Sequence, residues 1–358
     1  MNMISILLCI LLIVAAVSSH SSPSSSAARL SQRTTSYAKA ASECANASFL
    51  TNVANKYDVN CWWFCMRGIP HCIDPFTTRT PAARTMLHRQ EWEASCKDIV
   101  RSGKYRPYGA SADAPLALHG SLVAVAGLFF GDWLPVLSTA VGGEAGLVYG
   151  FEPTKSVRLA RATAAANRLP STHITHACLS NRSSLVRMCI KRSRDPGDSS
   201  GGSARIMPTA SASSVDDAAV ARDRCVQESE VRCATLDEAL PWQAHRVGLI
   251  LLDVEGHEAA ALEGAAEVIK KWKPILALER KLGQIMQEIP PTADSPLMEK
   301  LPSGGGRRSI FHACALNYQG VASCDGLNFY AATPLESMGQ TPMGRAARTW
   351  ARVHGGCR

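Results

Sequence analysis

The chain has 358 residues, of which 46% are hydrophobic and 19% charged, a composition that suits a globular protein with one large domain or two modest ones. Its formal net charge of +8 comes from 38 basic and 30 acidic residues. The basic residues are scattered along the chain and form no basic helix with interleaved aromatic residues. This pattern argues against a nucleic-acid partner.

The chain begins with an apolar run over residues 4–17 (ISILLCILLIVAAV), which is followed at once by serine-rich sequence. This run is shorter than the roughly 20 residues that a membrane-spanning helix needs, and its length is typical of a signal peptide. No Lys or Arg precedes it, so an uncleaved signal anchor is the alternative. Both interpretations assign residues 1–20 to targeting and place the rest of the chain in the secretory pathway, in the ER or Golgi lumen, or outside the cell.

The cysteine content agrees with an oxidising compartment. There are 13 cysteines, and setting aside Cys9 in the apolar run leaves an even number. In a secreted chain such residues are typical disulfide partners. Zinc is the alternative for the cluster formed by Cys61, Cys65, His71 and Cys72, although its spacing matches no recognised zinc finger. The sequons at Asn46 and Asn181 are N-glycosylation sites if the chain enters the lumen.

Composition divides the remainder of the chain. Residues 21–36 are a flexible Ser-rich stem, and residues 37–117 are a Cys-rich N-terminal extension. Residues 118–335 form the main domain, and residues 336–358 are a C-terminal tail.

The main domain alternates apolar strands with amphipathic helices, which indicates an α/β fold with a parallel sheet and crossover helices. The expected strands cover residues 121–126, 146–151, 173–177, 247–253, 275–279, 309–316 and 327–332. The expected helices of this domain cover residues 132–140, 155–168 and 257–272, and a further helical stretch is expected over residues 81–102 of the extension. Residues 193–223 and 290–308 are predicted to be loop insertions.

Ligands bind at the carboxyl ends of the strands in such a sheet, and three of these ends carry informative residues. The first is the loop that contains Gly127, Gly131 and Asp132, where glycine lets the backbone approach a ligand. The second is Glu152, which can accept hydrogen bonds from both ribose hydroxyls of a nucleoside. The alternatives are a tight strand-to-helix turn for the glycines and a helix-dipole cap for Glu152.

A third strand end carries four ionisable residues in close succession: Asp253, Glu255, His257 and Glu258. Such groups are costly after a buried strand unless they are solvated, paired or used in chemistry. Helix capping and salt bridges are the structural alternative. The carboxylates lack a clear set of partner ligands, so we expect no metal site.

The string over residues 251–279 (LLDVEGHEAAALEGAAEVIKKWKPILALE) resembles the signature of FkbM-type methyltransferases. Glu152, Asn167 and the Thr235-Leu236-Asp237 run also follow the order of that family, and the resemblance extends over residues 121–332. It implies a seven-stranded Rossmann-like sheet with helices on both faces. It also implies a domain that binds S-adenosylmethionine and transfers its methyl group to an oxygen, often a hydroxyl of a glycan or small metabolite.

The first loop departs from the family pattern, Asp-x-Gly-Ala-Asn-x-Gly. With Gly127 and Gly131 aligned to the two glycines, Val125 occupies the position of the acid that contacts the methionine amino group. Asp132 is a candidate replacement. The cofactor site predicted from the resemblance therefore comprises Gly127, Gly131, Asp132, Glu152 and Asp253.

Transfer to a hydroxyl requires a base, and His257 is the candidate because its imidazole titrates near neutral pH. Asp253 and Glu255 are predicted to orient the acceptor. Two rival functions remain open. An NAD-dependent oxidoreductase would need Gly-x-Gly-x-x-Gly, whereas this loop reads Gly-x-x-x-Gly. A non-catalytic lumenal binding module would explain Val125.

Overall fold

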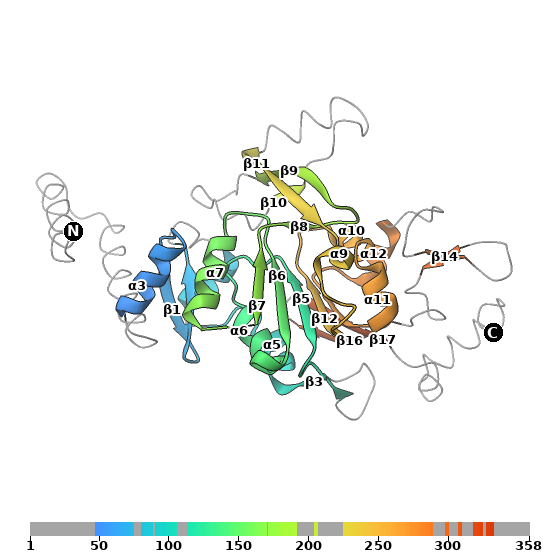
Figure 1. Cartoon of the computed structure of the whole chain (residues 1–358), viewed down its shortest axis with the longest axis horizontal. Coiled ribbons are helices and arrows are strands. Elements are labelled where there is room, and N and C mark those ends of the chain that lie inside the picture. Colours follow the sequence, from blue (N-terminus) through green and yellow to red (C-terminus); the bar gives the residue numbers. More distant parts are fainter. Residues whose placement is uncertain are drawn as a thin grey trace, which may run out of the picture.

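The computed structural model shows an α/β fold built around one large sheet (Figure 1). The structure describes residues 47–74, 80–88, 90–105, 114–169, 171–191, 204–206, 225–288, 298–300, 307–309, 318–324 and 327–332. The predicted targeting segment, the Ser-rich stem and the C-terminal tail lie outside these residues, as does the sequon at Asn46.

The central sheet has seven strands, and six of them run in the same direction. Their order across the sheet is β16 (Tyr318–Cys324), β17 (Leu327–Ala332), β13 (Ile275–Leu278), β12 (Val247–Leu252), β5 (Leu122–Ala126), β6 (Leu147–Phe151) and β7 (Thr172–Thr175). β17 runs antiparallel to both of its neighbours. The predicted seven-stranded, mostly parallel Rossmann-like fold is confirmed.

Helices bury both faces of this sheet, which explains why its central strands are uninterrupted apolar runs. Leu122 and Ala124 of β5 pack in a cluster with residues of α9 (Leu236–Ala239), α10 (Glu258–Glu263), α11 (Ala266–Trp272) and α12 (Leu282–Glu288). Val123 and Val125 point to the opposite face. There they pack with residues of α5 (Ala94–Ser102), α6 (Leu134–Ala140) and α7 (Val157–Ala166).

The strand order reverses direction beside β5. The chain continues from β5 to β6 and β7 on one side of the sheet, and β12 and β13 occupy the other side. The point between β5 and β12 is therefore a topological switch point, the usual ligand crevice of an open parallel sheet.

The helix predicted over residues 257–272 is two helices, α10 and α11, which meet at Gly264 and Ala265. Asp237 explains the break because it caps the start of the second helix. Its carboxylate accepts hydrogen bonds from the backbone N–H of Glu267 at 3.1 Å and of Val268 at 3.0 Å. A side chain from elsewhere in the chain thus starts a new helix inside a continuous apolar pattern.

A second, four-stranded sheet was not predicted. It has the order β10 (Ala204–Ile206), β9 (Ser184–Lys191), β11 (Cys225–Ala234) and β8 (Cys178–Leu179). β9 and β11 pair antiparallel across the segment interpreted as a loop insertion, and they lie above the main sheet in Figure 1. The insertion at residues 193–223 therefore contains one strand, β10, and the rest of it lies outside the described residues.

The other predicted insertion, residues 290–308, contains β14 (Met298–Lys300), which pairs with β15 (Arg307–Ser309). The strand predicted over residues 309–316 lies outside the described residues, apart from Ser309, which belongs to β15. The strand that joins the main sheet here is β16, which begins at Tyr318.

The N-terminal extension forms α3 (Ala47–Lys56), the hairpin of β1 (Trp62–Met66) and β2 (Ile69–Ile73), α4 (Pro81–Leu87) and α5. The single helix predicted over residues 81–102 is therefore two helices. A short ladder of β3 (Lys104–Tyr105) and β4 (Ala114–Pro115) leads into the main domain, where the 3-10 helix η2 (Gly143–Ala145) precedes β6.

The extension packs on α7 (Figure 1). The backbone N–H of Cys72 donates to Thr163 Oγ1 at 3.1 Å, and the Asn167 amide donates to the carbonyl of Pro70 at 2.7 Å. Phe130, from the first loop of the main domain, is buried in the same apolar cluster as Trp63 and Ile73. The extension thus contacts the loop that follows β5.

Three disulfides join described residues: Cys61–Cys72, Cys96–Cys324 and Cys178–Cys233. Cys65 and Cys189 are also disulfide-bonded. The disulfide interpretation of the N-terminal cysteines therefore replaces the zinc alternative. The nearby His71 is buried, and burial lowers its pKa to about 3, so its ring is neutral. No helix in the described part of the chain has the length and apolar character of a membrane span.

Candidate active site

The loops after β5 and β12 contact each other directly at the switch point. The backbone N–H of Asp253 donates to the carbonyl of Ala126 at 3.1 Å. Gly127 has a φ of +82°, and a Cβ at this position would lie 1.8 Å from the carbonyl oxygen of Asp253. Any other residue would therefore separate the two strand ends. The predicted cofactor residues Gly127 and Asp253 lie side by side.

Glu152 follows β6 and turns its buried carboxylate toward the same loop. One oxygen accepts a hydrogen bond from the backbone N–H of Phe129 at 2.8 Å. The other accepts from the N–H of Thr154 at 2.9 Å and from its hydroxyl at 2.6 Å. Burial raises the pKa of Glu152, and these hydrogen bonds oppose the rise. Glu152 thus fixes the first loop rather than the first turn of α7, which begins at Val157.

Several acidic side chains lie near Asp253, in the loop after β12. The pKa of Asp253 is raised well above its ordinary value, first by burial and then by the charges of Glu279, Glu93 and Glu255. Like charges close together in a poorly solvated site disfavour ionisation of one of their members. Glu255 adopts a left-handed conformation with a φ of +54°, which turns the chain toward α10.

His257 and Glu258 lie at the start of α10 and have different surroundings. The Nε2 atom of His257 is 3.2 Å from the hydroxyl of Ser180, and burial lowers the pKa of the imidazole. Glu258 is fully buried, accepts a hydrogen bond from the N–H of Gly256 at 3.3 Å and pairs with Arg280 at 3.5 Å. Glu258 thus stabilises the loop through these two contacts. His257, in contrast, is partly exposed.

Gly131 and Asp132 do not join the other predicted site residues. A Cβ on Gly131, whose φ is +80°, would lie 2.9 Å from the Cα of Ala160, so this glycine lets the loop pack closely on α7. The carboxylate of Asp132 is buried and forms an ion pair with Lys97, which is also buried. Asp132 is therefore held in a structural ion pair and is not a free replacement for an acid at Val125.

Sequence reasoning missed two polar residues of the extension that reach this region. Lys97 pairs with Asp132, and its ammonium group also donates to the carbonyl of Trp92 at 2.8 Å. Glu93 is buried and accepts a hydrogen bond from the indole N–H of Trp133 at 2.6 Å. Isolated polar residues in a helical segment give no sequence signal of such contacts.

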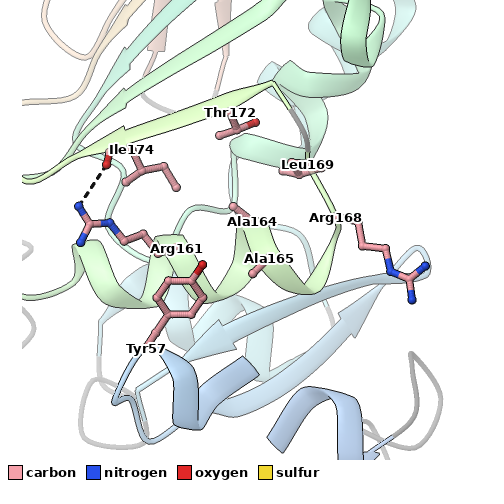
Figure 2. Close-up of a pocket in the computed structure, with 8 residues that line it drawn as sticks. All are labelled: Tyr57, Arg161, Ala164, Ala165, Arg168, Leu169, Thr172 and Ile174. Atoms are coloured by element: carbon pink, nitrogen blue, oxygen red, sulfur yellow. Dashed lines mark hydrogen bonds between the residues drawn. The ribbon is translucent and has the colours of Figure 1, made fainter. Parts of the chain in front are cut away.

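The described residues contain no group of three or more His, Cys, Asp or Glu side chains that could hold a metal ion. They do contain a cavity of about 650 Å³ where the extension meets the edge strand β7 (Figure 2). Tyr57, Arg161 and Thr172 are among the residues that line it, and Arg161 donates to the carbonyl of Ile174 at 3.1 Å. This cavity contains none of the predicted site residues.

Comparison with known families assigns the region that carries the site. Residues 125–301 match the family model described as the methyltransferase FkbM domain. These residues form an FkbM methyltransferase domain. The match begins inside β5 and ends just after β14, so the last two strands of the main sheet follow the matched region.

Two solved structures are similar to the chain, both at low identity. Methyltransferase FkbM from Methylobacillus flagellatus KT is 15% identical, with a TM-score of 0.29, and the alignment covers 57% of this chain and 44% of that protein. A SAM-dependent methyltransferase from Aquifex aeolicus is 13% identical, with a TM-score of 0.28, and the alignment covers 61% of this chain and 86% of that protein.

The chain thus aligns with less than half the length of the Methylobacillus protein. A search of the curated proteins finds no match. The family assignment depends on the match of residues 125–301 to the family model alone. Nothing about the site is inferred from the two structures.

Proposed function

We propose that the chain is an S-adenosylmethionine-dependent O-methyltransferase that acts on a hydroxyl of a glycan or small metabolite. The observation that carries the proposal is the buried Glu152 carboxylate, which lies within an FkbM domain at the carboxyl end of β6 and contacts the first loop. An acid in this place is suited to the ribose hydroxyls of an adenosine group. Gly127 and Asp253 complete the switch-point edge of the proposed cofactor site.

The residues present fit a cationic cofactor. S-adenosylmethionine carries a positive sulfonium and a positive ammonium group, and the acidic loop after β12 offers negative charge at the switch point. When bound, the cofactor supplies an electrophilic methyl group. The protein's main task is then to align donor and acceptor for an in-line displacement.

Gly127, Glu152 and Asp253 would hold the cofactor, which would supply its methyl group to the acceptor oxygen. The acceptor's hydroxyl proton passes to His257, and Asp253 and Glu255 orient the acceptor. Burial keeps the pKa of His257 below its ordinary value of 6.5, so the imidazole is neutral and able to accept a proton at neutral pH.

His257→Ala tests this assignment in the full-length oxidised chain. We expect the release of S-adenosylhomocysteine, measured with S-adenosylmethionine and a panel of sugar glycosides and hydroxylated metabolites, to fall by about 10²- to 10⁴-fold. The wild-type kcat/KM should decline as the pH falls, with its midpoint at a lower pH than an ordinary imidazole would give, because the base must be unprotonated.

The matched control is His245→Ala, which removes an exposed imidazole and should leave the rate unchanged. A His257→Ala enzyme with the full wild-type rate would remove His257 from the mechanism. Product release without any hydroxylated acceptor would argue against O-methylation.

One observation favours the rival function, a non-catalytic binding module. Val125 is almost fully buried in the apolar core, and Asp132 is engaged by Lys97, so neither supplies an acid to the first loop. Cofactor binding without turnover on any acceptor would support this rival. The Gly-x-x-x-Gly spacing of the first loop, from Gly127 to Gly131, argues against an NAD-dependent oxidoreductase.

We also propose that the protein acts in the secretory pathway. Three disulfides, including Cys96–Cys324 between the extension and β16, are compatible with an oxidising compartment. Asn181 is exposed, as a glycosylated residue must be. The proposal keeps the division into a targeting segment, an extension over residues 37–117, a catalytic domain over residues 118–335 and a tail.

A further inference from the structure

The two residues that follow β8 connect the start of α10 to its end. The Nε2 atom of His257, which directly precedes α10, lies 3.2 Å from the hydroxyl oxygen of Ser180. At the last residue of the helix, the carboxylate of Glu263 accepts a hydrogen bond from the side-chain amide of Asn181 at 2.9 Å. Between these contacts, the hydroxyl of Ser180 donates to the amide oxygen of Asn181 at 3.5 Å. A continuous series of hydrogen bonds therefore leads from Glu263 to His257.

The direction of each of these hydrogen bonds follows from the chemistry of its groups. A carboxylate only accepts, so Asn181 turns its NH2 group to Glu263 and its oxygen to Ser180. The amide oxygen also only accepts, so the hydroxyl proton of Ser180 points to Asn181. Because a hydroxyl has a single proton, the Ser180 oxygen is left to accept a hydrogen bond from His257. The Nε2 atom of the neutral imidazole then carries the proton, and Nδ1 carries the lone pair.

The backbone holds Ser180 in a fixed position. Its N–H donates to the carbonyl of Ala234 at 2.9 Å, and the Cys178–Cys233 disulfide joins β8 to β11 beside it. Its carbonyl packs against Gly264, where a Cβ would lie 2.0 Å from the oxygen. The side chain of Ser180 is buried. The hydroxyl is therefore in place before any substrate binds.

The second ring nitrogen of His257 is available for chemistry. His257 is partly exposed, and no hydrogen bond to its Nδ1 atom comes from the described part of the chain. A neutral imidazole accepts a proton only at the nitrogen that bears the lone pair. Protonation at Nδ1 would keep the hydrogen bond from Nε2 to Ser180 and strengthen it, because the donor is then charged.

We infer that Ser180 is a positioning residue that holds His257 in the tautomer with the proton on Nε2, so that Nδ1 takes the proton of the acceptor hydroxyl. In this step the O–H bond of the acceptor breaks and its electron pair stays on the acceptor oxygen. The new N–H bond uses the lone pair of Nδ1. The inference rests on the proposed function, since it requires His257 to be the base. Asn181 and Glu263 orient Ser180 in turn.

The ¹⁵N signals of the imidazole test the tautomer in the wild-type, full-length oxidised chain, independently of any variant's folding. With ¹⁵N-labelled histidine above neutral pH, we expect Nε2 of His257 to give the signal of a protonated nitrogen and Nδ1 that of an unprotonated one. The spectrum of His257→Ala assigns the two signals. A proton on Nδ1 in the wild-type protein, or a mixture of the two tautomers, would overturn the inference.

The same spectrum and the reaction rate of Ser180→Ala test the role of the hydroxyl. The variant should contain a measurable share of the tautomer with the proton on Nδ1. Its kcat should fall about 10- to 100-fold, the loss of one hydrogen bond to the charged form of the base, while the KM for S-adenosylmethionine stays near its wild-type value. Ser180→Thr keeps a hydroxyl and should restore both the tautomer and most of the rate.

The matched control is Ser183→Ala, which removes a neighbouring exposed hydroxyl and the sequon at Asn181 but none of the hydrogen bonds between Glu263 and His257. Its kcat should equal that of the wild type. An equal loss of kcat in Ser183→Ala and Ser180→Ala would overturn the inference, because the effect would not depend on the contact with His257.

Two outcomes separate the inference from the proposed function. A wild-type kcat for Ser180→Ala, together with a large loss for His257→Ala, would overturn the inference and leave the proposed function intact. A wild-type rate for His257→Ala would remove the base from the proposed reaction and overturn the inference with it.

Discussion

Glu152→Ala should abolish measurable S-adenosylmethionine binding, with a loss of at least about 100-fold in affinity. The variant removes the only carboxylate proposed for the ribose hydroxyls, and a site built to pair with hydroxyls discriminates strongly through such groups. It also removes the acceptor for the N–H groups of Phe129 and Thr154 and for the Thr154 hydroxyl. Calorimetric titration at 25 °C measures the affinity.

The same substitution should lower the free energy of unfolding by about 2–4 kcal/mol, since each buried donor left without a partner costs about 1–3 kcal/mol. Urea denaturation measures this loss and shows under which conditions the variant is folded. Glu144→Gln, which changes an exposed carboxylate just before β6, is the control and should alter neither quantity. A folded Glu152→Ala protein with wild-type affinity would remove Glu152 from the cofactor site.

The second large effect concerns the buried ion pair between the extension and the first loop. Lys97→Met should lower the free energy of unfolding by about 3–5 kcal/mol, because it leaves the charge of Asp132 buried without a partner. Both side chains are nearly inaccessible, with exposed fractions of 1% for Lys97 and 8% for Asp132. Urea denaturation of the oxidised protein measures the loss.

The double variant Lys97→Met, Asp132→Asn should recover at least half of that loss, because no unpaired charge remains. The exposed pair of Arg158 and Asp58, 2.8 Å apart, provides the control. Arg158→Met should change the free energy of unfolding by less than about 1 kcal/mol. A loss no larger for Lys97→Met than for Arg158→Met would show that the buried pair does not hold the extension in place.

The sequence is most informative where burial is complete. The runs that form β5 and β12 are apolar throughout because helices cover both faces of the sheet, so their strands and the loops that follow them are predictable. The strands β9 and β11 could not be predicted, because they pair with each other across a long polar segment. Cross-strand pairing at such a distance leaves little local pattern.

The residues of the candidate site also differ in how well the sequence predicts their positions. Glu152 and Asp253 are predictable because each directly follows a buried strand, and strand ends of a parallel sheet meet at one edge. Glu93 and Lys97 are not, because they reach the first loop from a helix of the extension, and their roles depend on tertiary packing. The ion pair that Asp132 forms with Lys97 could not be predicted either, since nothing local to the loop indicates this partner.

The most direct test of the account is calorimetric titration of the wild-type, full-length oxidised chain with S-adenosylmethionine and S-adenosylhomocysteine. We expect both ligands to bind at one site per chain with micromolar Kd values. The absence of binding in a sample shown to be folded by circular dichroism would contradict the account. It would mean that an FkbM domain with valine at position 125 has lost its cofactor.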